Sequence, residues 1–507
     1  MFKRIRSYCL FGIKAVPVSV EVDSSQGLPG FTLVGLPDNA VRESRERVVS
    51  AIRSIGKVVT GFRTTVNLSP ADLRKEGSAL DLPLAIGMLV STGEVEIPQL
   101  DRYVFVGELS LDGLMKPVRG VLSIAMSLAK EDSVLVISKE NAQEASLVEG
   151  LRYICAESLE ECVEALEAND ESMIQVASGL NGFAKPPLEN VPDFADVVGM
   201  EGVKRALEVA AAGAHNFLLV GSPGAGKTLC ARCLPGILPE MTELEILETT
   251  RIHSCARRAG DSASFRPVLV RPFRTPHHSA SMVSLVGGGA RLLPGEASLA
   301  HNGVLFLDEL PEFNRCVLEA LREPMEDGAI SVSRASGTVV WPARFMMGAA
   351  MNPCPCGYAM DPKRVCTCLP DARKRYREKI SGPLLDRIDI QVSVPPVDSS
   401  LFLGSKKGES SASIRERVCL ARNIQRKRFA EYPFKNNAEM TSECARRFAA
   451  MDDATSRFSV SAADKMNLSA RAYYRLLKVA RTIADLRQAE SVEISDLSEA
   501  LRYRTIG

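Results

Sequence analysis

The sequence predicts an α/β fold that consists of two α/β units followed by a helical C-terminal part. Strand-like and helical segments occur together from residue 1 to about residue 170, and a second such pattern begins at residue 193 after a stretch without periodicity. After residue 394 the chain is mostly helical in pattern. We therefore expect an N-terminal domain over 1–170, a linker over 171–192, a core domain over 193–394 and a C-terminal helical domain over 395–507.

Composition is that of an ordinary globular protein. Of the 507 residues, 46% are hydrophobic and 24% are charged, and no uncharged apolar run of about 18 residues predicts a membrane span. Lys plus Arg and Asp plus Glu both total 62, so any surface for a polyanion has to be local. The 13 cysteines favour reduced thiols or a metal site over a disulfide framework. We expect a cytoplasmic protein without a membrane partner.

The first 170 residues contain an amphipathic helix and several strands. The apolar start of the chain is interrupted by Lys14 and Pro17 and has no small-residue cleavage site, so we interpret it as a strand and not as a signal peptide. The helix is expected over 39–56, where it ends at a glycine. Further strands are expected at 31–35, 64–68, 103–109 and 133–138.

A glycine-rich loop opens the core domain between a strand and a helix. The segment "FLLVGSPGAGKT" fits the spacing G-x-x-x-x-G-K-[ST], in which backbone N–H groups surround phosphates. Lys227 can reach the terminal phosphates, and the Thr228 hydroxyl is suited to Mg²⁺. The alternative, a glycine-rich turn, does not explain the Lys-Thr pair. The expected nucleotide-binding residues of this loop are Gly221, Ser222, Pro223, Gly224, Ala225, Gly226, Lys227 and Thr228.

Two further strands end in residues suited to nucleotide chemistry. "GVLFLDEL" ends in Asp308, which is expected to hold Mg²⁺, and Glu309, which is placed to polarise an attacking water. "RFMMGAAMN" ends in Asn352, whose amide can orient water against a γ-phosphate. The alternatives are a strand that meets a solvated turn and an asparagine that caps a strand before Pro353.

Two arginines in the second half of the chain are candidates for phosphate contacts. Arg387 in "SGPLLDRIDI" is either a salt-bridge partner of Asp386 or Asp389, or an arginine finger directed at the nucleotide of a neighbouring subunit. Arg471 follows Ser469, a plausible helix cap, in the first turn of a helical segment. A cation near the positive end of a helix dipole favours an anion contact.

Four cysteines follow Asn352 closely, in two C-x-C pairs. Four thiolates could form a tetrahedral structural Zn²⁺ site, although C-x₂-C is the more usual spacing. The alternatives are four reduced surface thiols and a redox disulfide. The sequence leaves this choice open for Cys354, Cys356, Cys366 and Cys368.

The ordered set of motifs resembles the AAA+ ATPases, in particular their magnesium-chelatase-like branch and, within it, the YifB/ComM family. This resemblance extends over nearly the whole chain. It implies ATP and Mg²⁺ as cofactors, a homohexameric ring with nucleotide between subunits, and a helical lid. The segments that carry it are "PGFTLVGLPDNAVRESRERVVSAI", "VNLSPADLRKEGSALDLPLAIGML", "RPFRTPHHSASMVSLVGGG", "PGEASLAHNGVLFLDELPEF" and "ISGPLLDRIDI".

Residue roles follow from the resemblance. It implies that Lys227 and Thr228 belong to Walker A, that Asp308 and Glu309 form Walker B, and that Asn352 is sensor 1. It further implies that Arg387 is the arginine finger and Arg471 is sensor 2. Val198 and Gly199 match the segment near adenine, where Met200 stands in place of an expected glutamine.

The family resemblance implies a DNA motor, a hexameric helicase that promotes branch migration in homologous recombination and natural transformation, with recombination proteins as partners. A basic stretch over 251–278 could line a ring pore and grip the phosphates of single-stranded or branched DNA, or could be a solvated face. A hairpin at Arg334 could also project toward the pore. The basic stretch has one acid, Asp261, against Arg251, Arg257, Arg258, Arg266, Arg271, Arg274, His277 and His278.

The first domain resembles the Lon-protease-like fold, also described as ribosomal S5 domain 2-like. Ser78 lies near the expected catalytic serine, but no lysine falls where its partner would be: Lys75, Lys116 and Lys130 lie elsewhere. We therefore expect a non-proteolytic domain. The alternatives to a DNA motor are a metal-chelatase-type motor, whose partner's D-x-S-x-S site is not found here, and a protein-remodelling ATPase.

Overall fold

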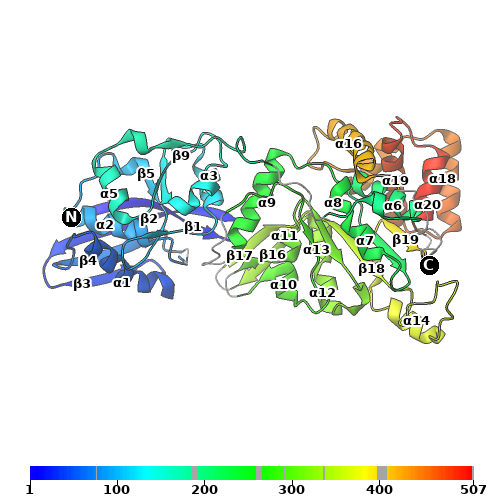
Figure 1. The fold of residues 1–507 in the computed structure, drawn as a ribbon, viewed down its shortest axis with the longest axis horizontal. Coiled ribbons are helices and arrows are strands. Elements are labelled where there is room, and N and C mark those ends of the chain that lie inside the picture. The colour runs from blue at the N-terminus through cyan, green and yellow to red at the C-terminus, as the bar shows by residue number, and fades with distance from the viewer. Residues whose placement is uncertain are drawn as a thin grey trace.

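The computed structural model describes residues 1–72, 74–75, 77–184, 191–257, 265–289, 292–334, 337–396 and 408–504. An N-terminal sheet, a core sheet and a group of C-terminal helices follow one another along the long axis of the molecule (Figure 1). In the described part of the chain, we find no helix that is both long and apolar enough to cross a membrane.

The N-terminal domain is built on an eight-stranded sheet of order β10-β9-β8-β5-β1-β2-β4-β3. Its longest ladder pairs β1 and β2 antiparallel from Phe2↔Asp23 to Phe11↔Lys14, so the predicted first strand is a hairpin of two strands. The predicted strands at 31–35, 64–68 and 133–138 and the helix are confirmed, whereas the strand predicted over 103–109 is divided into β5 and β6 (Glu108–Leu109), and β6 pairs with β7 (Met115–Lys116) outside this sheet. The strands are β1 (Phe2–Phe11), β2 (Lys14–Gln26), β3 (Gly30–Val34), β4 (Phe62–Ser69), β5 (Tyr103–Phe105), β8 (Val134–Ser138), β9 (Arg152–Ala156) and β10 (Gln175–Val176).

Apolar residues alternate along these strands and meet the helices that cover the sheet. Val18, Val20 and Val22 of β2 are buried with residues of α1 and α2 in one hydrophobic cluster. The helices are α1 (Asn39–Ser54), α2 (Asp81–Thr92), α3 (Val121–Leu128), α4 (Ala142–Ala145) and α5 (Leu159–Glu167). β10 lies inside the segment predicted as a linker and pairs with β9. The sheet therefore extends further along the chain than expected.

The core domain contains a five-stranded sheet of order β12-β15-β18-β11-β19, in which every pair of neighbours is parallel. Parallel strands present all their carboxyl ends at one edge, where ligands of open α/β sheets bind. That edge receives the loop after β11, Asp308 after β15 and Asn352 after β18. The strands are β11 (Phe217–Gly221), β12 (Phe273–Arg274), β15 (Val304–Leu307), β18 (Met346–Met351) and β19 (Ile390–Val394).

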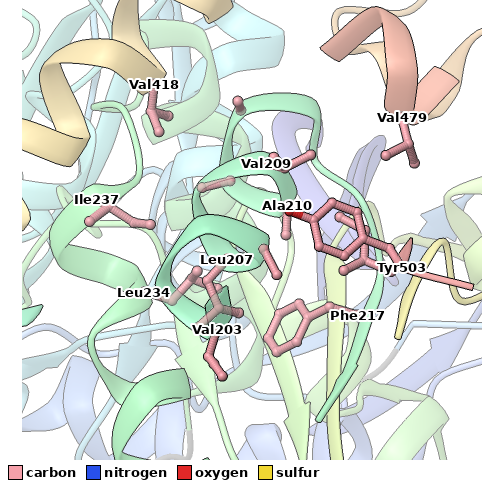
Figure 2. Packing of buried hydrophobic residues seen from close by; sticks show 14 of the residues in the cluster. Val203, Leu207, Val209, Ala210, Phe217, Leu234, Ile237, Val418, Val479 and Tyr503 are labelled. Atoms are coloured by element: carbon pink, nitrogen blue, oxygen red, sulfur yellow. The ribbon is translucent and has the colours of Figure 1, made fainter. Parts of the chain in front are cut away.

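Helices on both sides cover the core sheet. Figure 2 shows how α6 (Glu201–Gly213), with Val203 and Leu207, packs between Phe217 of β11 and the helices α8 and α16. The remaining helices of this domain are α7 (Lys227–Arg232), α8 (Leu234–Ile237), α9 (Glu243–Ala256), α10 (Met282–Val286), α11 (Glu296–Leu299), α12 (Arg315–Ala320), α13 (Arg322–Asp327), α14 (Pro370–Arg377) and α15 (Gly382–Leu385).

A β-hairpin of the core domain packs on the N-terminal domain. The hairpin consists of β16 (Ala329–Arg334) and β17 (Gly337–Pro342), and its buried Trp341 and Val339 share one cluster with Ile13. The β1–β2 turn approaches it so closely that a Cβ atom at Gly12 would lie 2.1 Å from Val339 Cγ1. The Arg251 guanidinium of α9 donates to Ile13 O at 2.7 Å in the same region. The β1–β2 turn therefore holds the hairpin in place.

The C-terminal part is helical, as predicted, and is joined to the core by buried charges. Asp389, just before β19, accepts from Arg475 Nη1 at 2.9 Å and lies 3.2 Å from His215 Nδ1. Burial alone would raise the pKa of Asp389, but Arg475 and His215 hold it well below its usual value. The helices are α16 (Ser411–Arg428), α17 (Ser442–Phe448), α18 (Asp453–Lys465), α19 (Ala470–Leu486) and α20 (Ile494–Arg502).

We predict that Asp389→Asn lowers the free energy of unfolding by about 3 kcal/mol, because it leaves a mostly buried Arg475 without a counter-charge. Urea unfolding followed by circular dichroism measures the change. The exposed Asp464→Asn is the control and should unfold like the wild type. Equal urea midpoints for the two variants would contradict the importance of this ion pair.

Candidate functional site at the carboxyl edge of the core sheet

The predicted phosphate loop connects the buried strand β11 to helix α7. Gly224 and Gly226 have φ of 76° and 84°, values that favour glycine and let the backbone turn before Lys227. Lys227 Nζ donates to Gly221 O at 2.7 Å, to Ser222 O at 3.0 Å and to Asn352 Oδ1 at 3.0 Å. Burial lowers the pKa of Lys227, while Asp308 and Glu309 oppose that shift. The ammonium therefore points along the loop toward Asn352.

Thr228 and Asp308 meet beside this lysine. Thr228 Oγ1 donates to Asp308 Oδ2 at 2.7 Å, and Asp308 Oδ1 accepts from the backbone N–H of Glu309 at 3.0 Å. A hydroxyl and a carboxylate at this distance are oxygen ligands of the kind that Mg²⁺ prefers. The structure thus brings together Lys227, Thr228, Asp308 and Asn352, which lie as much as 125 residues apart in the chain.

Glu309 lies next to a histidine, His278, for which the sequence had suggested a different role. His278 Nδ1 lies 3.3 Å from Glu309 Oε2, and the His278 ring lies 4.1 Å from that of His277. The sequence had placed both histidines in a DNA-contacting stretch. The parallel pairing of β12 with β15 explains the difference, because it carries the residues after β12 to the edge where Glu309 lies.

A cavity of about 510 Å³ opens on the other side of Glu309 and Asn352. Tyr376 of α14 forms part of its wall, and burial raises the pKa of that phenol to about 12. Lys379 Nζ lies 3.4 Å from Glu312 Oε2 at its rim. The lining residues are Glu309, Glu312, Asn352, Pro355, Ala372, Arg375, Tyr376 and Lys379. Sequence reasoning had not included the α14 side chains, because their helix joins the site only through the fold.

The segment expected near adenine adjoins the phosphate loop. Val198 is half-buried and Gly199 is exposed, directly before the buried Met200. A Cβ atom at Gly226 would lie 3.0 Å from Met200 Cε, and Cys230 Sγ lies 3.4 Å from Met200 Sδ. Met200 therefore packs under the loop, where its thioether fills apolar space.

The two candidate arginines lie at the opposite edge of the sheet. Arg387 precedes β19, whose Ile390 pairs with Phe217 at the amino end of β11, so its backbone is more than about 13 Å from Gly221. The Arg387 guanidinium is buried and lies 2.5 Å from Glu326 Oε1, and Arg471 pairs with the same carboxylate. The salt-bridge alternative for Arg387 thus concerns Glu326 instead of Asp386 or Asp389. Ser469 caps α19 as expected.

The basic stretch over 251–278 is largely engaged inside the chain. Arg251 donates to Ser123 Oγ at 2.9 Å, Arg271 to Asn302 O at 2.7 Å, and Arg274 to both carboxylate oxygens of Glu296. These three guanidinium groups have partners within the chain, so neither alternative for the stretch, a DNA-gripping surface or a solvated face, describes them. Arg266 is exposed, Arg257 lies over the Phe265 ring, and Arg258 and Asp261 fall outside the described residues. Arg334 ends β16 of the predicted hairpin.

The four cysteines come together as a candidate metal site. Their Sγ atoms all lie within 4.8 Å of one another, and the Cys356 backbone N–H donates to Cys368 Sγ at 3.3 Å. Backbone N–H groups, that of Tyr358 first, lower the pKa of the Cys356 thiol to about 5. Thiolates grouped in this way suit a tetrahedral Zn²⁺ ion.

The serine of the Lon-like motif and the nearby lysine have separate partners. Ser78 Oγ donates to Glu108 Oε2, whereas Lys75 is buried and its Nζ donates to Pro70 O. A Ser–Lys dyad requires the lysine to accept the serine proton. Ser78 and Lys75 thus contact different groups, and a non-proteolytic role of the domain stays a prediction.

The family models and the similar proteins that match this chain all belong to one group of related proteins. Residues 193–401 match the family described as magnesium chelatase, subunit ChlI; residues 20–141 match subunit ChlI of Mg-chelatase, and residues 408–504 match the subunit ChlI C-terminal family. The chain is 43% identical to competence protein ComM of Haemophilus influenzae and 42% identical to the uncharacterized protein YifB of Escherichia coli, each match covering 99% of this chain and 97% of the relative. An uncharacterized protein of Mycobacterium tuberculosis is 41% identical, with 99% of both chains covered.

Proposed function

Because the chain belongs to the YifB/ComM family of magnesium-chelatase-like proteins, we propose that it is an Mg²⁺-dependent AAA+ ATPase that acts on DNA as a homohexameric ring. The observation that carries this proposal is the convergence of Lys227, Thr228, Asp308 and Asn352 at one sheet edge. Single-stranded or branched DNA is the proposed substrate, and branch migration during homologous recombination and natural transformation is the proposed task. Recombination proteins are the proposed partners, and the cytoplasm is the proposed location.

The proposed hydrolysis is divided among residues of this edge. When bound, Mg²⁺ supplies charge neutralisation between the β- and γ-phosphates. Thr228 and Asp308 are the residues that would hold it, and Lys227 exchanges its carbonyl and amide partners for phosphate oxygens. Glu309 accepts a proton from the attacking water, and the Asn352 amide orients that water. Release of Glu309 from His278 frees its carboxylate for this task.

The neighbouring subunit completes the proposed site. Arg387 and Arg471 lie at the amino edge of the sheet and share Glu326, so they are too far from Lys227 of their own chain to reach its nucleotide. In a head-to-tail ring, one surface of a subunit contacts a different surface of the next, and we propose that the amino edge faces the carboxyl edge in this way. We assign both arginines to the γ-phosphate of the adjacent subunit, where their charges stabilise the transition state.

The proposed DNA contacts are Arg334 of the hairpin and the exposed Arg266. We propose that the N-terminal domain is a Lon-like, non-proteolytic platform. It supports the hairpin through the close contact between Gly12 and Val339. The competing proposals are a metal-chelatase-type motor and a protein-remodelling ATPase. Both share the ATP site, so DNA dependence is what separates them from a DNA motor.

We further propose a structural Zn²⁺ ion at the four cysteines. Their thiolates supply all four ligands, so the site has no open position for chemistry. The metal joins the two C-x-C pairs and stabilises the segment between Asn352 and α14.

The central test gives the purified protein ATP, Mg²⁺ and a labelled three-strand or four-way DNA junction. The wild type should hydrolyse ATP and migrate the junction, and Lys227→Ala should lose at least about 100-fold of the ATPase rate, because removal of a preorganised charge of this kind costs that much. Lys130→Ala, an exposed lysine of the N-terminal domain, is the control. ATP hydrolysis by a wild type that neither binds nor migrates junctions would refute the DNA motor.

The assignment of Arg387 to a neighbouring subunit predicts complementation between two inactive variants. Lys227→Ala and Arg387→Ala should each be inactive alone. In rings mixed one to one, an intact Lys227 meets an intact neighbouring Arg387 at about a quarter of the interfaces. The ATPase rate of the mixture should therefore approach about a quarter of the wild-type rate. A mixture as inactive as its components would show that both residues act within one chain.

Metal analysis tests the zinc site. The wild type should carry about one Zn²⁺ per chain, and Cys354→Ser/Cys366→Ser should lose it, because two of four ligands are gone. Cys316→Ser changes an exposed cysteine that does not belong to the cluster and is the matched control. A wild type with less than about 0.2 equivalents of zinc after metal-replete purification would contradict the proposed zinc site.

A further inference from the structure

The four-cysteine loop, residues 354–368, lies against two parts of the proposed ATP site. It begins directly after Asn352 and Pro353, and its Pro355 lines the same cavity as Asn352 and Glu309. Its first cysteine, Cys354, is fully buried. The loop therefore forms part of the wall of the proposed ATP site.

Its closest approach is to the phosphate loop itself. A Cβ atom at Gly357 would lie 2.5 Å from Cδ and 2.6 Å from Cγ of Pro223. Real Cβ atoms do not come this close to a rigid ring, so only glycine fits there. Gly357 also has φ of +86°, in the left-handed region that favours glycine. Pro223 belongs to the predicted phosphate loop, between Ser222 and Gly224, so the backbone at Gly357 packs against the proline ring of that loop.

Hydrophobic burial contributes little to the position of the cysteine loop. Val365 is 90% exposed and Leu369, which follows the loop, is 74% exposed. The contacts within the loop are local, such as Arg364 Nη1 donating to the Tyr358 hydroxyl at 2.8 Å. Small segments without a core of their own depend on a cross-link for their fold. The link between Cys354/Cys356 and Cys366/Cys368 is the one that closes this loop around Gly357.

We propose that metal bound at the four cysteines holds Gly357 against Pro223, so that metal occupancy sets the affinity of the phosphate loop for nucleotide. Gly357 is then a positioning residue for the phosphate loop, and the metal site is its anchor. This inference rests on the proposed ATPase function. It adds an energetic coupling between the metal site and the nucleotide site of one chain. Without the metal, the loop no longer supports Pro223, and the backbone N–H groups that surround the phosphates lose their preorganisation.

The experiment measures the dissociation constant of a fluorescent ADP with Mg²⁺ for full-length protein, with and without zinc. Zinc is removed with a thiol-compatible chelator, and the protein is exchanged into Mg²⁺ buffer before binding. We expect about ten-fold weaker nucleotide binding by the metal-free wild type, within the usual range of coupling between sites. Cys366→Ser/Cys368→Ser should show the same loss without chelator. Circular dichroism checks that each protein stays folded.

Pro223→Ala is the discriminating variant, because it removes the ring that Gly357 contacts and leaves the cysteines intact. In Pro223→Ala, zinc removal should change the dissociation constant less than about two-fold, whatever its starting value. Gly357→Ala should retain zinc and bind nucleotide weakly, and Gly357→Ala/Pro223→Ala should bind nucleotide as Pro223→Ala does, because the clash is gone but the supporting contact is gone as well. Gly56→Ala, with φ of +75° and open space around its Cβ position, is the control for backbone strain alone.

Two outcomes would overturn the inference. Nucleotide affinity of the wild type that does not respond to zinc removal would show that the loop does not support the phosphate loop. An equal loss in the wild type and in Pro223→Ala would show that zinc acts by another route. A wild type that binds no nucleotide with zinc present would instead refute the proposed ATPase, which keeps the two failures distinct.

Discussion

The hydrogen bond between Lys227 and Asn352 is the contact on which the rest of the site depends. It joins the loop after β11 to the end of β18, and both lie at one edge because the sheet is parallel. An ammonium in a partly buried position needs acceptors, and here it finds two loop carbonyls and one amide oxygen. These are neutral partners, which a phosphate group can replace at little cost because its negative charge attracts the lysine more strongly. The structure thus keeps the lysine extended without an ion pair that the ligand would have to break.

The same parallel order places Arg387 at the edge of the sheet opposite the phosphate loop of its own chain. Arg387 comes before β19 and Asn352 comes after β18, so the sheet separates the two side chains although 35 residues divide them in sequence. Glu326 occupies both arginines and keeps two cations together near a partly buried surface. The hydrogen bond from Arg387 lowers the pKa of Glu326, so the carboxylate stays charged at neutral pH. In the proposed ring, a phosphate of a neighbouring subunit would compete with Glu326 for both arginines, so that ring assembly would also complete the proposed site.

Sequence reasoning was strongest where a motif is local and the backbone sets its shape. The turn at Gly224 and Gly226, the strands that end at Asp308 and Asn352, and the cap at Ser469 all follow from neighbouring residues. Sequence reasoning was weakest for side chains whose contact partners come from segments that are distant in the sequence. Arg271 and Arg274 were expected to face DNA, yet carbonyls and Glu296 occupy them. Nothing in the local sequence distinguishes a cation that packs inside the chain from one that faces a ligand, since that choice is made by tertiary contacts.

His278 and Gly357 show what kind of information only the fold supplies. Each lies within a segment whose composition suggested another role, a basic stretch for His278 and a cysteine cluster for Gly357. Each is brought to the proposed ATP site by the order of strands: β12 beside β15 carries His278 to Glu309, and β18 beside β11 carries the cysteine loop to Pro223. Because both contacts arise from one parallel edge, a change that moves β18 relative to β11 alters the loop support and the Lys227–Asn352 bond together. The proposed nucleotide site, the proposed metal site and the position of Asn352 therefore all depend on the same strand pair.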